Sequence, residues 1–147
     1  MKNFITTLAV FLLLIIFPLQ TALETVNEQR KSKFNNIVHV AVQQARKEGG
    51  FTKEIEKKMR DSLEALVDPG DINEIKIALG EDGVVKYRDD GFDQDIIKYS
   101  IEIPIGKIVA VPRIFGLSKE EEEKYNKYIV KKEGSVLSEK LRSQIKE

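Results

Sequence analysis

The stretch that decides the fold is residues 4–23, FITTLAVFLLLIIFPLQTAL, in which no residue carries a charge. About 20 helical residues at about 1.5 Å each match the hydrocarbon thickness of a bilayer. The segment is therefore expected to be a membrane helix or the apolar region of a cleaved secretory signal. The best cleavage position, after Ala22, places Gln20 where a small residue should stand. We expect an uncleaved signal anchor, and a cleaved signal remains the alternative.

Charge is distributed unevenly on either side of this stretch. Lys2 is the only charged residue before Glu24. Almost all of the 24 basic residues and all of the 24 acidic residues therefore follow the uncharged stretch. The sequence thus predicts two parts, a transmembrane helix over 1–23 and a charged domain over 24–147. The basic residues just after the helix favour a cytoplasmic domain, whereas the very short N-terminal tail resembles a signal sequence. We expect a single-pass membrane protein whose C-terminal domain is extracytoplasmic.

The composition excludes several kinds of chemistry. With no cysteine and one histidine, the chain has no disulfide framework, no Cys-ligated zinc and no multi-histidine metal site. A net charge of zero argues against a nucleic-acid partner. No nucleophile motif, phosphate-binding loop or dinucleotide glycine pattern occurs. We therefore expect a protein that is not an enzyme and that has no catalytic residue, cofactor or metal site.

Two features could suggest a site but are expected to be ordinary surface. The acidic turn with Asp89, Asp90, Asp93 and Asp95 offers oxygen ligands, but it lacks the spacing of a calcium loop. His39 shares the polar side of the expected helix with amide residues and has no evident catalytic partner. We interpret both as solvated.

The helix is expected to continue beyond the membrane segment. Residues 24–48 contain neither Pro nor Gly, and apolar residues recur every three or four positions, which predicts one helix over 4–48 ended by Gly49-Gly50. A second helix should begin at the N-cap Thr52 and stop before Asp68-Pro69-Gly70.

Alternating residues predict a small sheet in the remainder. Residues 75–79, 84–88 and 97–105 should form antiparallel strands, and a last strand should start at Tyr128 and end before Gly134. A capping box at Ser118 and Glu121 predicts a short helix, and apolar residues four apart predict a terminal helix from Leu137.

These elements predict an α+β fold with the shape of a lollipop. It has a long N-terminal helix, first transmembrane and then amphipathic, a second short helix and an antiparallel sheet of about four strands. The apolar stripe of the long helix and the apolar face of the sheet both have to be buried, so we expect them to pack against each other. The residues expected at this contact are Phe34, Ile37, Val38, Ala41, Ala45, Ile97, Tyr99, Ile101, Ile103 and Ile105.

The order of these segments resembles type IV pilins, and in particular the TadE-like proteins of tight-adherence pilus systems. The resemblance covers most of the chain. It rests on the order and kind of the predicted helices and strands and not on residues with a chemical role. The segments that carry it are FLLLIIFPLQ, AVQQARKEGGF, IEKKMRDSLEALV, NEIKIAL, DIIKYSIEIPIG, VPRIFGLS and YIVKKEGSV.

The resemblance implies a structural protein that is anchored and assembled through its first helix. Its partners would be other pilin-like subunits, further copies of itself, or membrane proteins that assemble a cell-surface filament, together with membrane lipid. The glycine and glutamate of a pilin precursor's processing site are absent from MKNFITTLAV, which favours an accessory role. The alternative is a secreted binding module. The residues implied in anchoring and assembly are Phe4, Leu8, Phe11, Leu12, Leu13, Leu14, Ile15, Ile16, Phe17, Pro18 and Leu19.

Overall fold

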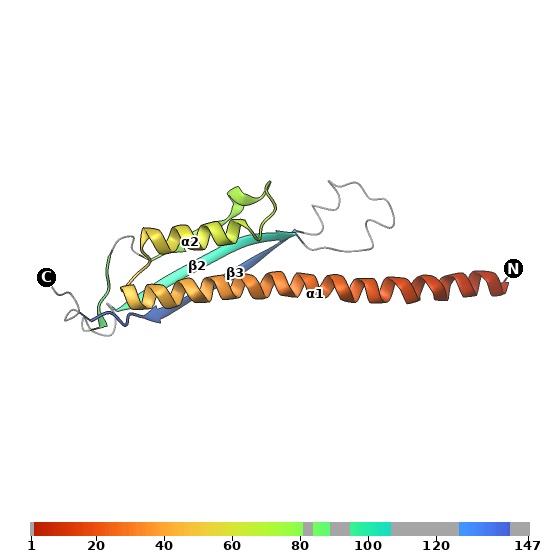
Figure 1. Cartoon of the computed structure of the whole chain (residues 1–147), viewed down its shortest axis with the longest axis horizontal. Coiled ribbons are helices and arrows are strands. Elements are labelled where there is room, and N and C mark those ends of the chain that lie inside the picture. Colours follow the sequence, from red (N-terminus) through yellow and green to blue (C-terminus); the bar gives the residue numbers. More distant parts are fainter. Residues whose placement is uncertain (1, 81–83, 89–94, 107–126, 142–147) are drawn as a thin grey trace. The chain divides into compact units, whose positions relative to one another are not determined.

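The computed structural model describes residues 2–80, 84–88, 95–106 and 127–141 (Figure 1). Two α-helices come first, α1 (Lys2–Glu48) and α2 (Lys53–Glu64), followed by the 3₁₀ turn η1 (Ile72–Glu74). Three strands follow, β1 (Lys76–Leu79), β2 (Ile96–Gly106) and β3 (Lys127–Leu137). The α+β class, the long first helix and the second helix are confirmed.

The end of α1 is set by a glycine. Gly49 has a φ of 80°, in the left-handed region that glycine adopts without strain. The N–H of Gly50 then donates to the carbonyl of Ala45 at 2.9 Å, the bond that closes a Schellman cap. The chain is thereby turned out of the helix at the position the sequence predicts.

The start of α2 is set by a side chain. The hydroxyl of Thr52 accepts a hydrogen bond from the N–H of Ile55 at 3.3 Å, which satisfies one of the free donors of the first turn. Ile55, Met59 and Leu63 lie on the buried face of α2. The helix stops at Glu64, a few residues before the expected Asp68-Pro69-Gly70. From Ala65 onwards the chain passes through turns.

The strands form one antiparallel sheet in the order β1-β2-β3. Ile77 of β1 lies opposite Ile101 of β2, and Lys76 lies opposite Glu102. In the first part of β2 the expected alternation is present, since Ile97, Ile101 and Ile103 are buried while Lys98 is exposed. It is lost near the end of the strand, where Pro104, expected on the polar face, is buried like its neighbours Ile103 and Ile105.

Three expectations for the C-terminal half are wrong or incomplete. Residues 84–87 form no strand, because the N–H of Lys86 donates to the carbonyl of Gly49 rather than to a neighbouring strand. The last strand does not stop before Gly134 but continues to Leu137. Residues 138–141 are not helical, so the expected terminal helix does not begin at Leu137. The expected helix at Ser118 and residues 142–147 lie outside the described parts of the chain.

The chain divides into two compact units. The N-terminal unit is residues 1–31 with 106–128, and the sheet unit is residues 32–105 with 129–147. The core of the sheet unit combines side chains from α1, α2, the residues after α2, and β2. Its buried apolar residues are Phe34, Val38, Ala41, Val42, Ala45, Ile55, Met59, Leu63, Val67, Ile75, Ile97, Ile101, Ile103 and Ile105.

Candidate functional site

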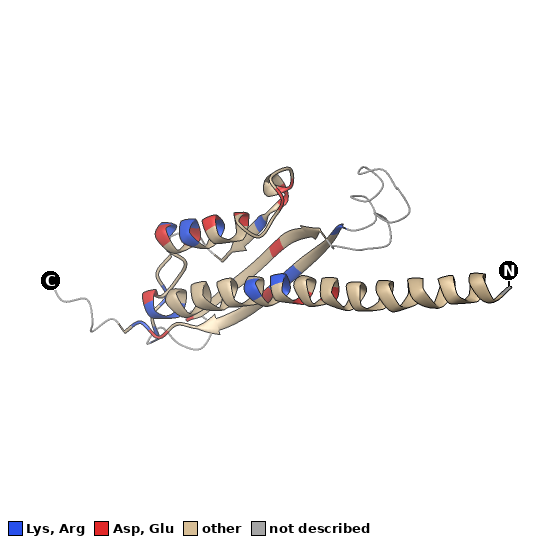
Figure 2. Ribbon diagram, turned by 45° about the vertical axis from the view of Figure 1, so that its right-hand side comes forward, with Lys and Arg blue, Asp and Glu red and all other residues tan. Residues whose placement is uncertain are grey.

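The apolar half of α1 exposes nearly all of its large side chains. The side chain of Phe4 is 73% exposed and that of Phe17 is 76% exposed. Most of the other large apolar side chains between Phe4 and Leu19 are exposed as well. Of the residues expected in anchoring, Ile16 alone is half-buried. Figure 2 shows the same stretch as a length of α1 without charged side chains. Such a surface is unusual on a soluble protein, where contiguous exposed apolar patches are small.

This half of α1 has the length and composition of a membrane span. Its most apolar 18-residue window has a mean hydropathy of 2.2, and none of that window is buried inside the protein. The core helix of a soluble protein would be largely buried, so that explanation does not fit. A secretory signal has the same length and composition near an N-terminus.

Two hydroxyl groups within the apolar half bond to the helix itself. The hydroxyl of Thr7 donates to the carbonyl of Asn3 at 2.8 Å, and that of Thr21 donates to the carbonyl of Phe17 at 3.0 Å. Pro18 lies inside the helix and has no N–H to donate to the turn before it. Membrane helices tolerate such a proline, and hydroxyls bonded within the helix are compatible with a lipid surrounding.

Polar contacts appear in the N-terminal unit where the apolar stretch ends. The guanidinium of Arg30 donates to the carbonyl of Gly106 at 3.2 Å, and Glu28 lies 4.0 Å from the ammonium of Lys31. Burial raises the pKa of Tyr128, Glu28 adds to that increase, and Arg30 opposes it. The helix therefore changes from apolar to polar surroundings between Leu23 and Arg30.

The residues expected at the helix–sheet contact are mostly in the core. Phe34, Val38, Ala41, Ala45 and four isoleucines of β2 are buried, whereas Ile37 and Tyr99 are half-buried. The ring of Tyr99 meets that of Phe51 edge to face, with centroids 6.3 Å apart. Its hydroxyl lies beneath Gly134, where an added Cβ would come within 2.8 Å of it. A larger residue at 134 would therefore have to displace the Tyr99 side chain.

A polar clasp, made by residues 138–140, holds the end of β3 and was not predicted. Ser138 donates from its N–H to the carbonyl of Asp95 and from its hydroxyl to the carbonyl of Lys86. The N–H of Glu139 donates to the carbonyl of Arg46, and its carboxylate pairs with the Arg46 guanidinium. The expected helix from Leu137 is replaced by these bonds.

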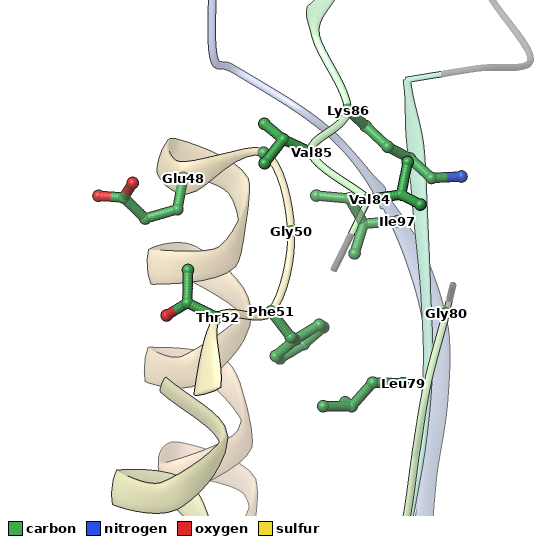
Figure 3. Close-up of a pocket in the computed structure, with 11 residues that line it drawn as sticks. Glu48, Gly50, Phe51, Thr52, Leu79, Gly80, Val84, Val85, Lys86 and Ile97 are labelled. Carbon is green, nitrogen blue, oxygen red and sulfur yellow. The ribbon is translucent and has the colours of Figure 1, made fainter. Parts of the chain in front are cut away.

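A small apolar cavity of about 130 Å³ lies in the sheet unit (Figure 3). The side chains of Phe51, Leu79 and Ile97 face a common space, whereas the charged end of Lys86 points away from it. The cavity is smaller than the about 300–1,000 Å³ of typical small-molecule sites. Its lining residues are Glu48, Gly49, Gly50, Phe51, Thr52, Leu79, Gly80, Val84, Val85, Lys86 and Ile97.

The outer face of the sheet carries a row of opposite charges. The ammonium of Lys131 lies 3.5 Å from the carboxylate of Glu102 and 2.7 Å from that of Glu133, and Lys76 approaches Glu102 at 3.9 Å. The hydrogen bond and charge of Glu133 raise the pKa of Lys131, and Glu102 adds to that increase. The lysines and Glu133 are exposed and Glu102 is half-buried, so each pair contributes little to the stability of the fold.

The two remaining candidates offer no reactive arrangement. His39 is exposed on α1. Of the acidic turn, Asp95 is buried, so the expectation that the turn is solvated is wrong at this residue. Asp89, Asp90 and Asp93 lie outside the described residues. Across residues 2–80, 84–88, 95–106 and 127–141, no group of three or more His, Asp or Glu side chains is placed to hold a metal ion.

Comparison with known proteins gives no family. No family model, no curated protein and no solved structure matches the chain.

Proposed function

We propose that the protein is a membrane-anchored, non-enzymatic, pilin-like component of a cell-surface pilus or of its assembly platform. The supporting observation is the contrast in burial along α1. Phe34 and Val38 are fully buried in the sheet unit, whereas Phe4 to Leu19 are left almost entirely uncovered by the described residues. One helix thus combines a part that belongs to a small α+β domain with a part that needs other surroundings.

The exposed apolar half requires a partner that is itself apolar. A fully buried Leu, Ile or Phe side chain is stabilised by about 1.5–3 kcal/mol relative to water. The row of such side chains from Phe4 to Leu19 therefore strongly favours lipid or neighbouring apolar helices over solvent. In the proposed role the segment is held in the membrane and also packs against other pilin-like subunits.

The sheet unit fits the proposed role as a small extracytoplasmic domain. A helix stripe packed on an antiparallel sheet is the arrangement that the pilin-like interpretation requires, and its exposed surface is rich in charged pairs. In this proposal the C-terminal domain lies outside the cytoplasm and the first helix crosses the membrane once. Nothing in the role requires a bound cofactor.

Fractionation of the native protein, with sequencing of its mature N-terminus, tests this proposal. We expect the protein in the membrane or sheared-filament fraction, with the apolar segment retained. Recovery only from the medium, with residues 1–22 removed, would contradict the proposal and support the alternative of a secreted binding module. The observation behind this alternative is that the same N-terminal helix also has the length and composition of a signal sequence.

A further inference from the structure

The last residue of β2 and the start of β3 lie close to α1 just beyond its uncharged stretch. Within the N-terminal unit, the guanidinium of Arg30 donates to the carbonyl of Gly106, which ends β2. Tyr128, at the start of β3, lies near enough to Glu28 and Arg30 for their charges to act on the pKa of its hydroxyl. These contacts place Gly106 and Tyr128 at the level of residues 28–30 of the helix.

This level of α1 falls in the headgroup layer of a bilayer that the uncharged stretch spans. The stretch ends at Leu23, and Glu28 follows about 7.5 Å further along the helix, at a rise of about 1.5 Å per residue. The headgroup layer on each side of the hydrocarbon core is about 5–8 Å thick. Glu28 and its neighbours therefore lie in the outer part of that layer, and a tilt of the helix would bring them closer to the hydrocarbon.

The side chains at this level include types that favour a boundary between lipid and water. Tyr128 is half-buried, and a tyrosine has an apolar ring and a hydroxyl that needs a polar partner, which is why tyrosines are enriched at membrane surfaces. Lys31 is exposed, and a lysine near the end of a membrane helix can extend its ammonium to the lipid phosphates. Glu28 lies 4.0 Å from that ammonium and offsets part of its charge, so the tyrosine ring carries most of the preference.

We propose that Tyr128 lies in the lipid headgroup layer and anchors the start of β3 to the membrane surface. The inference rests on the proposed membrane role of α1 and goes beyond it, because a helix that only crosses the bilayer could leave Tyr128 in water. The N-terminal unit then contacts lipid through two segments that are distant in sequence, the apolar half of α1 and the start of β3. The bond between Arg30 and Gly106 holds the end of β2 at the same level.

Tryptophan fluorescence measures the depth of this position, because the chain contains no tryptophan. In the full chain reconstituted in phosphatidylcholine vesicles, the emission of Tyr128→Trp should be quenched more by lipids brominated near the headgroup than by lipids brominated near the chain end. Tyr87→Trp is the matched control, because Tyr87 is also half-buried but follows Lys86, which bonds to Gly49 at the far end of α1. Its emission should be quenched by neither lipid. Equal quenching of the two variants would overturn the proposal.

Two further variants separate this proposal from the membrane role itself. Phe11→Trp, near the middle of the uncharged stretch, should be quenched most by the lipids brominated near the chain end. Quenching of Phe11→Trp without quenching of Tyr128→Trp would overturn the headgroup contact and leave anchoring through α1 intact, whereas quenching of neither would contradict both. Gln29→Trp, at an exposed position of the same level of α1, decides the depth if Tyr128→Trp does not fold. It should be quenched most by the lipids brominated near the headgroup, and the absence of that quenching would overturn the proposal.

Discussion

The two halves of α1 are built from similar apolar residues but are covered in opposite ways. From Phe34 to Ala45 the apolar side chains form a stripe, and that stripe is buried in the core of the sheet unit. From Phe4 to Leu19 they surround the helix and remain exposed. A stripe can be covered by one sheet, whereas a helix that is apolar all round needs cover on every side.

This difference indicates where each half obtains its stability. The second half is stabilised by the protein's own β2 and α2, so its contribution can be measured as a free energy of unfolding. The first half gains little from the described residues, and in the proposed role its contribution comes from lipid or from other chains. Matched substitutions in the two halves of α1 separate these two sources of stability.

Truncation of a core phenylalanine should have the largest effect. Phe34 has no exposed surface, so Phe34→Ala should reduce the free energy of unfolding by about 3–5 kcal/mol through lost burial and a cavity. Phe11→Ala removes the same atoms from a side chain that is 61% exposed. It should change the free energy of unfolding by less than about 0.5 kcal/mol. Chemical denaturation of the full chain in mild detergent measures both. Equal losses would show that the halves are not covered differently.

A charge in the first half should act on membrane retention. Leu13→Arg places a cation near the middle of the apolar segment, which costs about 2.5–3.5 kcal/mol on insertion scales and should shift the protein out of the membrane fraction. Gln44→Arg puts the same side chain on an exposed position of the second half and should leave retention unchanged. Unchanged retention of Leu13→Arg would argue against a membrane-resident segment.

A substitution at the end of α1 should have a smaller effect confined to the sheet unit. In Gly49→Ala the residue keeps a φ of 80°, and its Cβ would clash with the carbonyl oxygen of Lys86. We expect a loss of about 1–3 kcal/mol in the free energy of unfolding. Gly70→Ala, with no neighbouring atom within 4 Å of its Cβ, is the control and should change it little. Thermal unfolding by circular dichroism measures both, and equal melting temperatures would contradict the close contact at Gly49.

Local patterns were sufficient to predict the helices and the central strand. The cap at Thr52, the glycine turn at Gly49 and the strict alternation in β2 each depend on residues within one or two turns of chain, so the sequence alone reveals them. The buried side of α1 was also predictable, because its apolar residues recur every three or four positions.

The errors fall where distant contacts decide the structure. Residues 84–87 alternate weakly but lie against Gly49, a contact across more than thirty residues that no local pattern encodes. Gly134 was interpreted as a strand end, yet the strand continues because the absence of a side chain there makes room for Tyr99. Leu137 and Leu141 have helical spacing, but the bonds of Ser138 and Glu139 to Asp95 and Arg46 hold the chain extended.

Labelling of one cysteine in each half of α1 tests most directly whether the first half lies in a membrane. In the full chain reconstituted in lipid vesicles, Phe11→Cys should react very slowly with a water-soluble maleimide, because the bilayer shields it. Gln44→Cys, exposed on the second half, should react rapidly under the same conditions. We expect this difference in labelling rate to disappear after denaturation in detergent. Rapid labelling of Phe11→Cys in intact vesicles, at the rate of Gln44→Cys, would contradict the claim that the first half of α1 lies in a membrane.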